Sequence, residues 1–286
     1  MELLQLKYFC DAAETQNFSK TAEKYFVPPS SVSQSIRRLE KELGVPLFER
    51  RANHIVLNEE GKIFYNAVTK SGKILSDATR KLSDSTEEVR GEIRLHVFCN
   101  RRIVAEAIQP FSRQYPQVSF VVNHGFDSEE DFDLIIADQD FTGKQLAGQP
   151  LITEEIALAC SQNHPLAQRE TVSLNELEQE QFITMQQNGS HYLMTRRFCN
   201  RAGFVPKISI QCDDPFYMRK YIELGLCVGF VPLFSWQGQI SEALVCKKIP
   251  GLLRTTYVYW KEGRYMSKAV ETFLGLLVEM TSGYSL

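Results

Sequence analysis

The sequence lacks the patterns that mark membrane-spanning, secreted and metal-binding proteins. No apolar run among its 286 residues reaches the roughly 18 needed to cross a bilayer, and the N-terminus has no signal-peptide pattern. The seven cysteines are scattered and form no C-x-x-C pair, which argues against disulfides and structural zinc. The five histidines lie far apart, without the paired spacing of a metal site. We therefore expect a cytoplasmic protein without a bound metal.

Catalytic motifs are missing as well. The sequence contains no P-loop, no G-x-G-x-x-G, no H-E-x-x-H and no G-x-S-x-G, and it shows no nucleophile–base constellation. The acidic run Asp213-Asp214-Pro215 is better explained as a helix N-cap followed by proline at the first helical position. The sequence therefore predicts a protein that is not an enzyme and has no cofactor.

The charge balance gives little sign of a nucleic-acid partner until it is examined locally. The chain has a formal net charge of −3, with 43% hydrophobic and 23% charged residues, as in ordinary globular proteins. Its length favours two or three domains. Residues 30–51, however, hold five basic side chains against three glutamates. Clustering on one face, more than the total charge, is what neutralises phosphates.

Residues 18–51 predict two short helices around a tight turn. Val27-Pro28-Pro29 ends the first helix, because proline cannot continue it. We expect Ser30 or Ser31 to cap the second helix and Gly44 to end it. The apolar positions of the second helix recur at helical spacing and predict a buried stripe of Val32, Ile36, Leu39 and Leu43.

The opposite face of this second helix has the composition of a DNA-reading surface. Short polar groups at a helix N-terminus suit base edges, and guanidinium groups suit guanine or phosphate. The predicted contacts on this helix are Ser30, Ser31, Ser33, Gln34, Arg37, Arg38 and Lys41. Residues 47–57 then resemble a two-stranded wing, whose tip carries Arg50 and Arg51. We expect these two arginines on the phosphate backbone or in a minor groove, and the alternative is a solvated loop.

A long helix without proline is predicted from its N-cap Asn58 to about Val89. Its apolar positions recur at alternating spacings of four and three, a heptad seam that implies a partner helix. The alternative is a helix lying on its own domain, which would show a wider apolar stripe. The side chains predicted to contact a second copy of the chain are Phe64, Val68, Leu75, Ala78 and Leu82.

From Gly91 onward the pattern changes to alternating strands and helices. The predicted strands are 93–97, 118–123, 134–137, 156–160, 208–212, 227–231 and 258–260. The predicted helices are 103–114, 173–178, 191–202, 215–224 and 267–280. This alternation argues for open, mainly parallel sheets with helices on both faces.

Three segments of this α/β region are placed to bind a ligand. In open α/β sheets, ligands bind at the carboxyl ends of strands, near helix N-termini with free N–H groups. The ends of the strands at 93–98 and 227–231 and the turn before the helix at His191 fit that description. The predicted effector contacts are Cys99, Asn100, Arg101, Arg102, Asn188, Gly189, Ser190, Phe230 and Val231.

Arg101 and Arg102 indicate the charge of the ligand. Cations in the first turn of a helix oppose its dipole by roughly 0.3–1 kcal/mol each. A bound anion would offset this cost through charge-assisted hydrogen bonds, so we expect a small carboxylate or other anion as effector. The alternative is that both side chains point into water. Cys99 is a candidate redox sensor if these arginines lower its pKa, and otherwise a small packed residue.

Several motifs along the chain resemble the LysR-type transcriptional regulators. In the first part these are LKYF (6–9), NFSKTAEKY (17–25), VSQSIRRLEKELGVPLFER (32–50) and LNEEG (57–61). In the second part they are NHPLA (163–167) and GLCVG (225–229). Two departures stand out. Pro28-Pro29-Ser30 replaces the usual Ser-Gln-Pro, so the base-reading glutamine is absent, and the segment 125–133 is shorter than usual.

The resemblance implies a three-part architecture. Residues 1–58 would form an α-rich winged helix-turn-helix domain, residues 59–90 a long linker and dimerisation helix, and residues 91–286 an α/β effector-binding domain. The last would consist of two Rossmann-like subdomains, as in the type 2 periplasmic-binding-protein fold. Subdomain I would comprise residues 91–160 and 263–286, and subdomain II residues 161–262.

The resemblance also implies a sequence-specific transcriptional regulator, controlled by a small molecule bound between the two subdomains. Its partners would be double-stranded DNA carrying an interrupted inverted repeat, the effector, and further copies of itself in a dimer or tetramer. RNA polymerase is left open as another partner. The alternative is a two-lobed small-molecule-binding protein or enzyme whose N-terminal region serves only for assembly.

Overall fold

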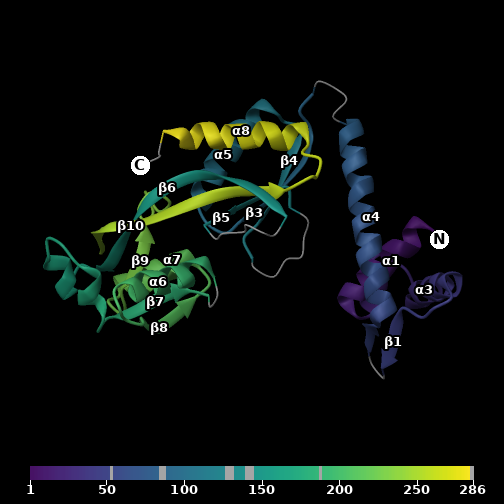
Figure 1. Ribbon diagram of the computed structural model, residues 1–286, viewed down its shortest axis with the longest axis horizontal. Helices are drawn as coiled ribbons and strands as arrows, with labels where there is room; N and C mark the ends of the chain where they lie inside the picture. The colour runs from purple at the N-terminus through teal and green to yellow at the C-terminus, as the bar shows by residue number, and fades with distance from the viewer. Residues whose placement is uncertain (52–53, 84–87, 126–131, 139–144, 187–188, 284–286) are drawn as a thin grey trace. The chain divides into compact units, whose positions relative to one another are not determined.

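The computed structural model describes residues 1–51, 54–83, 88–125, 132–138, 145–186 and 189–283 (Figure 1). The chain divides into two compact units, Met1–Ser85 and Thr86–Leu286. Each unit has its own buried apolar core. Within the described parts of the chain, no helix has both the length and the apolar character needed to cross a membrane.

The first unit is a helical domain with a two-stranded wing. Its elements are α1 (Leu3–Thr15), α2 (Phe18–Lys24), α3 (Pro29–Leu43), β1 (Phe48–Arg51), β2 (His54–Leu57) and α4 (Glu59–Ser83). β1 and β2 are antiparallel, as predicted for the wing. The predicted inner stripe of α3 is confirmed, since Val32, Ile36 and Leu39 are fully buried and pack with Phe9 of α1.

α3 begins earlier than the predicted serine cap. Its N-cap is Pro28 and its first residue is Pro29. Proline suits the first helical position because its φ is already helical and its missing N–H has no partner there. Ser30 and Ser31 therefore lie inside the first turn, and the prediction that either is the cap is wrong. Gly44 ends α3 with φ 77°, as expected.

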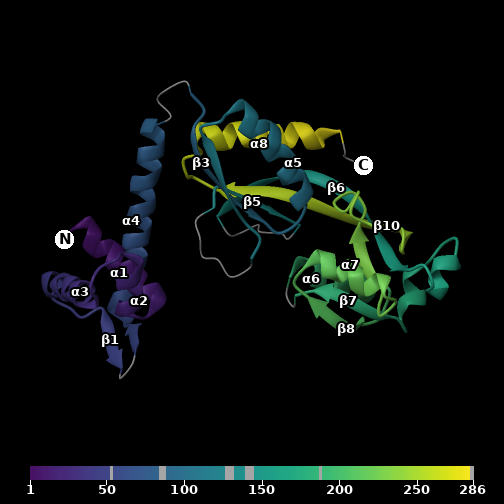
Figure 2. The ribbon, with the colours of Figure 1, turned by 180° about the vertical axis from the view of Figure 1, so that it is seen from behind.

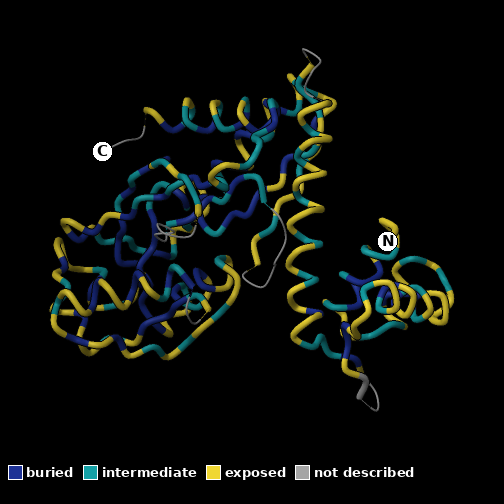
Figure 3. The backbone as a smooth tube through the Cα atoms, turned by 45° about the vertical axis from the view of Figure 1, so that its right-hand side comes forward, coloured by how far each residue is buried: buried dark blue, intermediate teal, exposed yellow. Residues whose placement is uncertain are grey.

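α4 is shorter than predicted. It extends to Ser83, and residues 88–90, the next ones described, are not helical, so the prediction of a helix to about Val89 is wrong. Figure 3 shows that the later turns of α4 are largely exposed.

The second unit is built on a six-stranded sheet with strand order β4-β3-β5-β10-β6-β9. β3 (Gly91–Val97) pairs in parallel with β4 (Val118–Asn123) and with β5 (Leu134–Ala137). β10 (Leu244–Lys261) pairs antiparallel with β5 and with β6 (Leu146–Ser161), and β6 pairs antiparallel with β9 (Gly229–Pro232). The sheet is mixed, so the prediction of mainly parallel sheets is wrong for this part.

The long strands β6 and β10 explain that error. They contain 16 and 18 residues and form an antiparallel ribbon, whereas short strands were predicted at 156–160 and 258–260. The ribbon carries the chain from one subdomain into the other and back. The outgoing strand β6 and the returning strand β10 are therefore paired neighbours that run antiparallel.

Two subdomains flank this ribbon. In the first, α5 (Arg101–Gln114) and α8 (Lys268–Ser282) lie side by side on the β3–β5 part of the sheet (Figure 2). In the second, β7 (Gln181–Met185) and β8 (Lys207–Cys212) pair in parallel. α6 (Ser190–Arg201) packs with Phe182 of β7, and α7 (Pro215–Glu223) packs with the next residue, Ile183. Successive strand residues face opposite sides, so the two helices cover opposite faces.

One local prediction in the second subdomain also fails, and one strand was not predicted. The helix predicted at 173–178 is a single 3-10 turn, η2 (Leu174–Leu177), and a similar turn, η1 (Pro165–Gln168), precedes it. Strand β7 was not predicted at all. The remaining predicted strands and helices are found within a few residues of their expected places.

Candidate functional site

The first candidate site is the outer face of α3. Ser30, Ser31, Gln34 and the three basic side chains Arg37, Arg38 and Lys41 are exposed, and Ser33 is half-buried. None of the three cations forms an ion pair with another side chain of the described chain. Three free charges on one face of a short helix give a surface that attracts phosphate groups.

The wing is fixed to α3 by one carboxylate. Oε1 of Glu40 accepts a hydrogen bond from the Leu47 N–H at 2.8 Å, which ties the C-terminal half of α3 to the start of the wing. Arg50 and Arg51 belong to strand β1, opposite Ile55 and His54. Their side chains lie outside the described structure, so their predicted DNA contacts stay predictions.

The predicted dimerisation residues of α4 fall into two groups. Phe64 and Val68 pack against the apolar core of the first unit. Leu75 and Leu82 are 56% and 75% exposed, and Ala78 between them is exposed as well. Only the second group is therefore available to a partner helix.

The second candidate site is a cavity of about 400 Å³ between the two subdomains, here called the Arg101 cavity. It is lined from the first subdomain by the segment 98–102 and His124, and from the second by residues at the start of α6 and α7 and by the turn after β9. Of the predicted effector residues, it is lined by Cys99, Asn100, Arg101, Arg102, Gly189 and Ser190.

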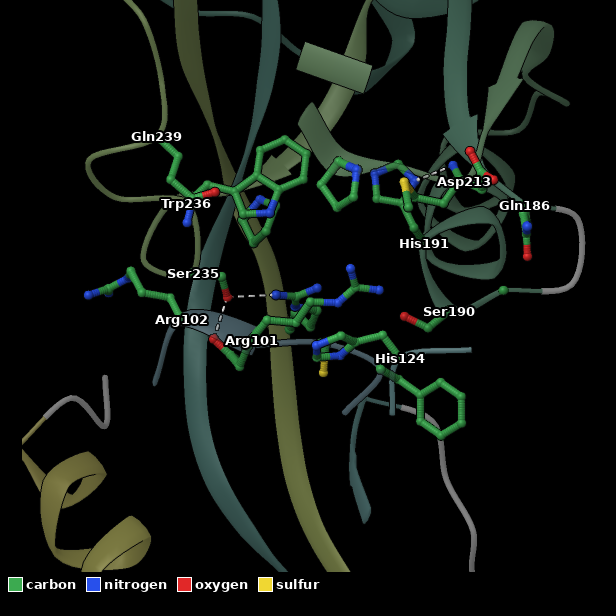
Figure 4. A pocket seen from close by; sticks show the side chains of 18 of the residues that line it. Arg101, Arg102, His124, Gln186, Ser190, His191, Asp213, Ser235, Trp236 and Gln239 are labelled. Carbon is green, nitrogen blue, oxygen red and sulfur yellow. Dashed lines mark hydrogen bonds between the residues drawn. The ribbon is translucent and has the colours of Figure 1, made fainter. Parts of the chain in front are cut away.

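Arg101 reaches into the open part of this cavity. Figure 4 shows its side chain extending between Ser235 and Ser190. The residue is half-buried, and its guanidinium makes neither a hydrogen bond nor an ion pair within the described chain. Burial lowers the pKa of Arg101, and the carboxylate of Asp214 opposes that effect from beyond ion-pair distance. Arg101 is thus a charge without an ion-pair partner among the described residues.

Arg102 is placed differently, although it also borders the cavity. Nη1 donates to Glu106 Oε1 at 2.7 Å, and Nη2 donates to the Phe234 carbonyl oxygen at 2.9 Å. The guanidinium also lies 4.8 Å from the centre of the Phe234 ring. Figure 4 shows its side chain pointing away from the open space that Arg101 enters. Arg102 therefore holds the turn after β9 against α5.

A buried ion pair forms one wall of the cavity. Nη2 of Arg254, on β10, donates to Glu154 Oε1 on β6 at 2.6 Å. Burial alone would raise the pKa of Glu154, but Arg254 and the hydrogen bonds from Ser235 hold it below its usual value. The pKa of Arg254 is raised, because burial, which would lower it, is outweighed by the charge of Glu154. Both groups are therefore charged in the folded protein.

Asn100 and Ser235 complete this buried network. The Ser235 hydroxyl lies within hydrogen-bond distance of two acceptors, Glu154 Oε1 at 2.6 Å and Asn100 Oδ1, and donates its one hydrogen to either of them. The amide nitrogen of Asn100 donates to Thr256 Oγ1 at 2.6 Å. Asn100 has φ 54° and directly precedes α5, a left-handed conformation that asparagine tolerates better than most residues. The network fixes the backbone from which Arg101 projects.

His191 is a neutral, structural part of the cavity wall. Its Nε2 donates to the Phe230 carbonyl oxygen at 2.8 Å, and its Nδ1 accepts from the Met185 N–H at 3.4 Å. Burial lowers its pKa to about 4. Both ring nitrogens are occupied, so His191 shapes the cavity and presents no charge to it near neutral pH.

The structure argues against a redox role for Cys99. Burial, followed by the nearby charge of Asp138, raises the pKa of its thiol to about 12. The condition for redox sensing, a pKa lowered by the neighbouring arginines, is therefore not met, and the alternative of a small packed residue is favoured. The reactive form of cysteine is the thiolate, and Cys99 is almost entirely protonated at neutral pH. It is a packed residue of the cavity wall.

The remaining sequence predictions for this site have mixed outcomes. Phe230 and Val231 are fully buried and do not line the cavity, because their side chains point into the two cores of the second subdomain. Asn188 and most of the segment 125–133 lie outside the described residues. Ser235, Trp236 and Arg254 also line the cavity and were not predicted from the sequence. No local motif marks them, since they come together only through the β6–β10 ribbon.

Metal binding finds no support in the described parts of the chain. They contain no group of three or more His, Cys, Asp or Glu side chains that could hold a metal ion.

Comparison with known proteins covers both units. The family described as "Bacterial regulatory helix-turn-helix protein, lysR family" matches residues 3–62, and "LysR substrate binding domain" matches residues 86–282. The transcriptional dual regulator GltC of Bacillus subtilis (strain 168) is 27% identical over 294 residues, covering 99% of this chain and 98% of GltC.

Two solved structures show the same fold. Full-length CbnR, complexed with its target DNA, is similar with a TM-score of 0.69 at 18% identity, over 99% of this chain and 100% of that one. The effector binding domain of QuiR, in complex with shikimate, is similar with a TM-score of 0.60 at 18% identity. This match covers 69% of the present chain and 100% of the QuiR chain. The predicted fold class, a winged helix-turn-helix followed by a linker helix and a two-subdomain α/β domain, is confirmed.

Proposed function

The chain belongs to the LysR family of DNA-binding transcriptional regulators, and from that premise we propose that a small anion bound by Arg101 controls its activity. One observation carries the proposal: Arg101 is a half-buried cation that faces a cavity of about 400 Å³ and has no ion pair with any side chain that the structure describes. Partial burial without a partner is costly for a charged group, and a bound anion offsets that cost through charge-assisted hydrogen bonds. The shikimate held by QuiR is a carboxylate, which supports this chemical class.

The anion proposal is tested by calorimetric titration of the full-length protein with a panel of small carboxylates and phosphate esters that begins with shikimate. For any ligand that binds, Arg101→Gln should weaken the affinity by about ten- to a hundredfold, the usual size of a hydrogen bond to a charged group. Arg113→Gln, an exposed arginine at the other end of α5, is the matched control and should have no effect. Equal affinities in the wild type and Arg101→Gln would refute the role of Arg101.

Arg102 offers a sharper comparison within the same cavity. Its guanidinium is held by Glu106 and by the Phe234 carbonyl, and Figure 4 shows it pointing away from the open space that Arg101 enters. Arg102→Gln should therefore weaken anion binding less than Arg101→Gln. An equal or larger loss in Arg102→Gln would show that the anion is held by the turn after β9 and not by Arg101.

For the DNA contacts, we propose that α3 enters the major groove with Ser30, Ser31, Ser33 and Gln34 near base edges and with Arg37, Arg38 and Lys41 toward bases and phosphates. The support is that all of these side chains except the half-buried Ser33 are exposed, and that the three cations form no ion pair with a described side chain. Pro29 occupies the first position of α3, so base reading has to begin at the serines that follow it.

A nuclease footprint on the DNA upstream of the protein's own gene tests this surface. Protection should be two-fold symmetric, because a symmetric dimer presents two copies of α3. It should also weaken as salt rises, because phosphate contacts release counterions. Protection of a single asymmetric site would contradict the dimeric arrangement.

We also propose that the exposed apolar side chains of α4 bind the same helix of a second copy. Leu75 and Leu82 lie seven residues apart, and Ala78 lies between them, which is the spacing of a coiled-coil seam. Leu75→Glu with Leu82→Glu should lower the molar mass measured by light scattering. The control, Lys70→Glu on an exposed position of the same helix, should leave the mass unchanged.

Control by the effector would follow from the position of the Arg101 cavity. Both subdomains line it, so a ligand that binds one degree of closure more tightly shifts the equilibrium toward that state. The closure would change the spacing of the paired DNA-binding domains through the dimer. Small-angle scattering with and without a ligand identified by titration should then show a change in dimensions, which Arg101→Gln abolishes.

A further inference from the structure

The Arg101 cavity contains a further free polar group, the imidazole ring of His124. Nδ1 of this ring lies 3.0 Å from the Val97 carbonyl oxygen. A carbonyl oxygen can only accept a hydrogen bond, so Nδ1 carries the proton and donates it. A neutral imidazole has one N–H group, which leaves Nε2 as an acceptor. Nε2 has no hydrogen-bond partner among the described residues.

The sheet fixes the position of this acceptor. β3 and β4 pair in parallel, and the pairing ends one residue before Val97 and His124. The hydrogen bond between these two residues therefore holds the ring at the carboxyl ends of both strands, where ligands bind in open α/β sheets. In Figure 4, His124 lies on the same side of the open space as Arg101, opposite Trp236. A ligand in the cavity can thus meet the cation and the acceptor together.

The charges around the cavity limit what else the ligand can carry. Arg102 and Arg254 also line it, but each is paired with a glutamate of the chain. Among the described lining residues, Arg101 is therefore the cation left for a carboxylate, and the other polar groups of the ligand should be neutral. A neutral donor suits the free acceptor of His124.

Asp213 favours a different group on the ligand. Its exposed carboxylate lines the cavity just after β8, and a negative charge there attracts an ammonium group. An amino acid is therefore the rival of a ligand with a neutral donor, and the probes below separate the two.

We propose that the Arg101 cavity binds a hydroxy acid, with its carboxylate paired to Arg101 and its hydroxyl group donating to His124 Nε2. The inference rests on the proposed function, because it takes Arg101 as the group that holds the anion. A C–H group in place of the hydroxyl leaves Nε2 without a donor. An ammonium group in that place brings a positive charge close to Arg101, which repels it. The hydroxyl is thus recognised by one ring nitrogen because the backbone holds the proton on the other.

Calorimetric titration of the full-length protein with matched probes tests the proposal. Lactate, propionate and alanine carry a hydroxyl group, a hydrogen atom and an ammonium group at the same carbon, and mandelate, phenylacetate and phenylglycine form a larger series. Shikimate and 1-cyclohexene-1-carboxylate are a third pair. At about pH 8, where histidine is ordinarily neutral, a hydroxy acid should bind about two- to tenfold more tightly than its parent acid, the usual effect of one hydrogen bond.

The outcomes separate this inference from the proposed function. Equal affinities of the hydroxy acids and their parent acids, or tightest binding of an amino acid, would overturn the hydroxy-acid inference and leave Arg101 as an anion site. Absence of binding by every probe would overturn both.

Variants assign the preference to His124, whose exposed position allows substitution without a change in folding. His124→Phe keeps a ring but has no acceptor. It should lower the affinity of the hydroxy acid to that of the parent acid and leave the parent acid unchanged within about twofold. Arg101→Gln should weaken both by the same factor and keep the preference. His54→Phe, at an exposed histidine of the first unit, is the matched control and should change neither. A preference for the hydroxy acid that survives in His124→Phe would refute the role of this ring.

Discussion

The two working regions of this regulator use the same kind of side chain in opposite environments. On α3, Arg37 and Arg38 stand in water on a helix whose inner stripe is independent of them. In the Arg101 cavity, Arg254 is buried and bonded to Glu154 and Ser235. Changing a side chain on the first surface should alter binding and leave folding alone. Changing one in the second should alter both, because the wall of the cavity is also part of the core.

The largest expected effect tests the buried side of this comparison. Arg254→Ala leaves the Glu154 carboxylate buried without its partner, which should lower the free energy of unfolding by about 3–5 kcal/mol. Denaturant unfolding followed by circular dichroism measures the loss. The double variant Arg254→Met with Glu154→Gln should recover part of it, since the charge of Glu154 is then removed as well, and only part, since the buried Asp138 carboxylate still loses its ion pair with Arg254. A loss below about 1 kcal/mol in the single variant would show that water enters this wall freely.

The second effect depends on pH and arises at His191. Its pKa is about 4 in the folded protein, below the 6.5 of a free histidine, because the ring is buried. The unfolded chain therefore binds the proton first, and protonation favours unfolding. The contribution of the neutral His191 ring to the free energy of unfolding is complete above about pH 6.5. It is lost as the pH falls toward 4, by roughly 3 kcal/mol in total.

Unfolding curves at about pH 7 and about pH 4.5 measure this difference. His191→Gln should flatten the pH dependence, because glutamine can hydrogen-bond in the same place but does not titrate. If the variant loses as much stability on acidification as the wild type, other groups carry the effect.

The third effect belongs to the exposed side. Arg38→Ala should weaken operator binding by about tenfold and lower the slope of log affinity against log salt by about one, as expected for one lost phosphate contact. The free energy of unfolding should not change, since Arg38 is exposed and has no ion pair in the described chain. Binding isotherms at several salt concentrations give both quantities, with Arg113→Ala as control. A lower free energy of unfolding in Arg38→Ala would show that the exposed arginines of α3 also stabilise the fold.

The smallest effect is a gain in stability in the first unit. Phe26, in the turn before α3, is 96% exposed and has φ 53°, a left-handed conformation that is unfavourable for a side chain like phenylalanine. Phe26→Asn should raise the free energy of unfolding by about 1 kcal/mol. Phe26→Ala removes the same exposed ring without relieving the backbone, so it should gain less. Equal gains would assign the effect to the ring itself.

Prediction from the sequence succeeded where the pattern is local. The inner stripe of α3, the wing and the start of α4 depend on spacings within a few residues, and all three were predicted correctly. The position of Arg101 at the start of α5 was also predicted, because a strand end and a helix start are both local signals. Such features need no knowledge of the rest of the fold.

Prediction failed where residues far apart in the chain act together. β6 contains Gly148 and Pro150, and β10 contains Pro250-Gly251, residues that normally argue against a strand. The ribbon tolerates the Pro250-Gly251 pair because its register shifts between Lys248 and Leu253. Glu154 and Arg254 are directly paired in that register, yet 100 residues separate them in sequence. No short motif could have indicated that contact.

The ribbon also has a consequence for how such a protein can be rebuilt during evolution. Thr153 and Thr255 face each other across the two strands, with their hydroxyl oxygens 2.9 Å apart. The second subdomain therefore leaves and returns at adjacent points, like a cassette inserted into the first. Exchange of the second subdomain between relatives would join the chain at the same two neighbouring strands. Glu154 and Arg254 would be exchanged together, as a matched pair. New ligand specificity can then be acquired without redesigning the part of the chain that reads DNA.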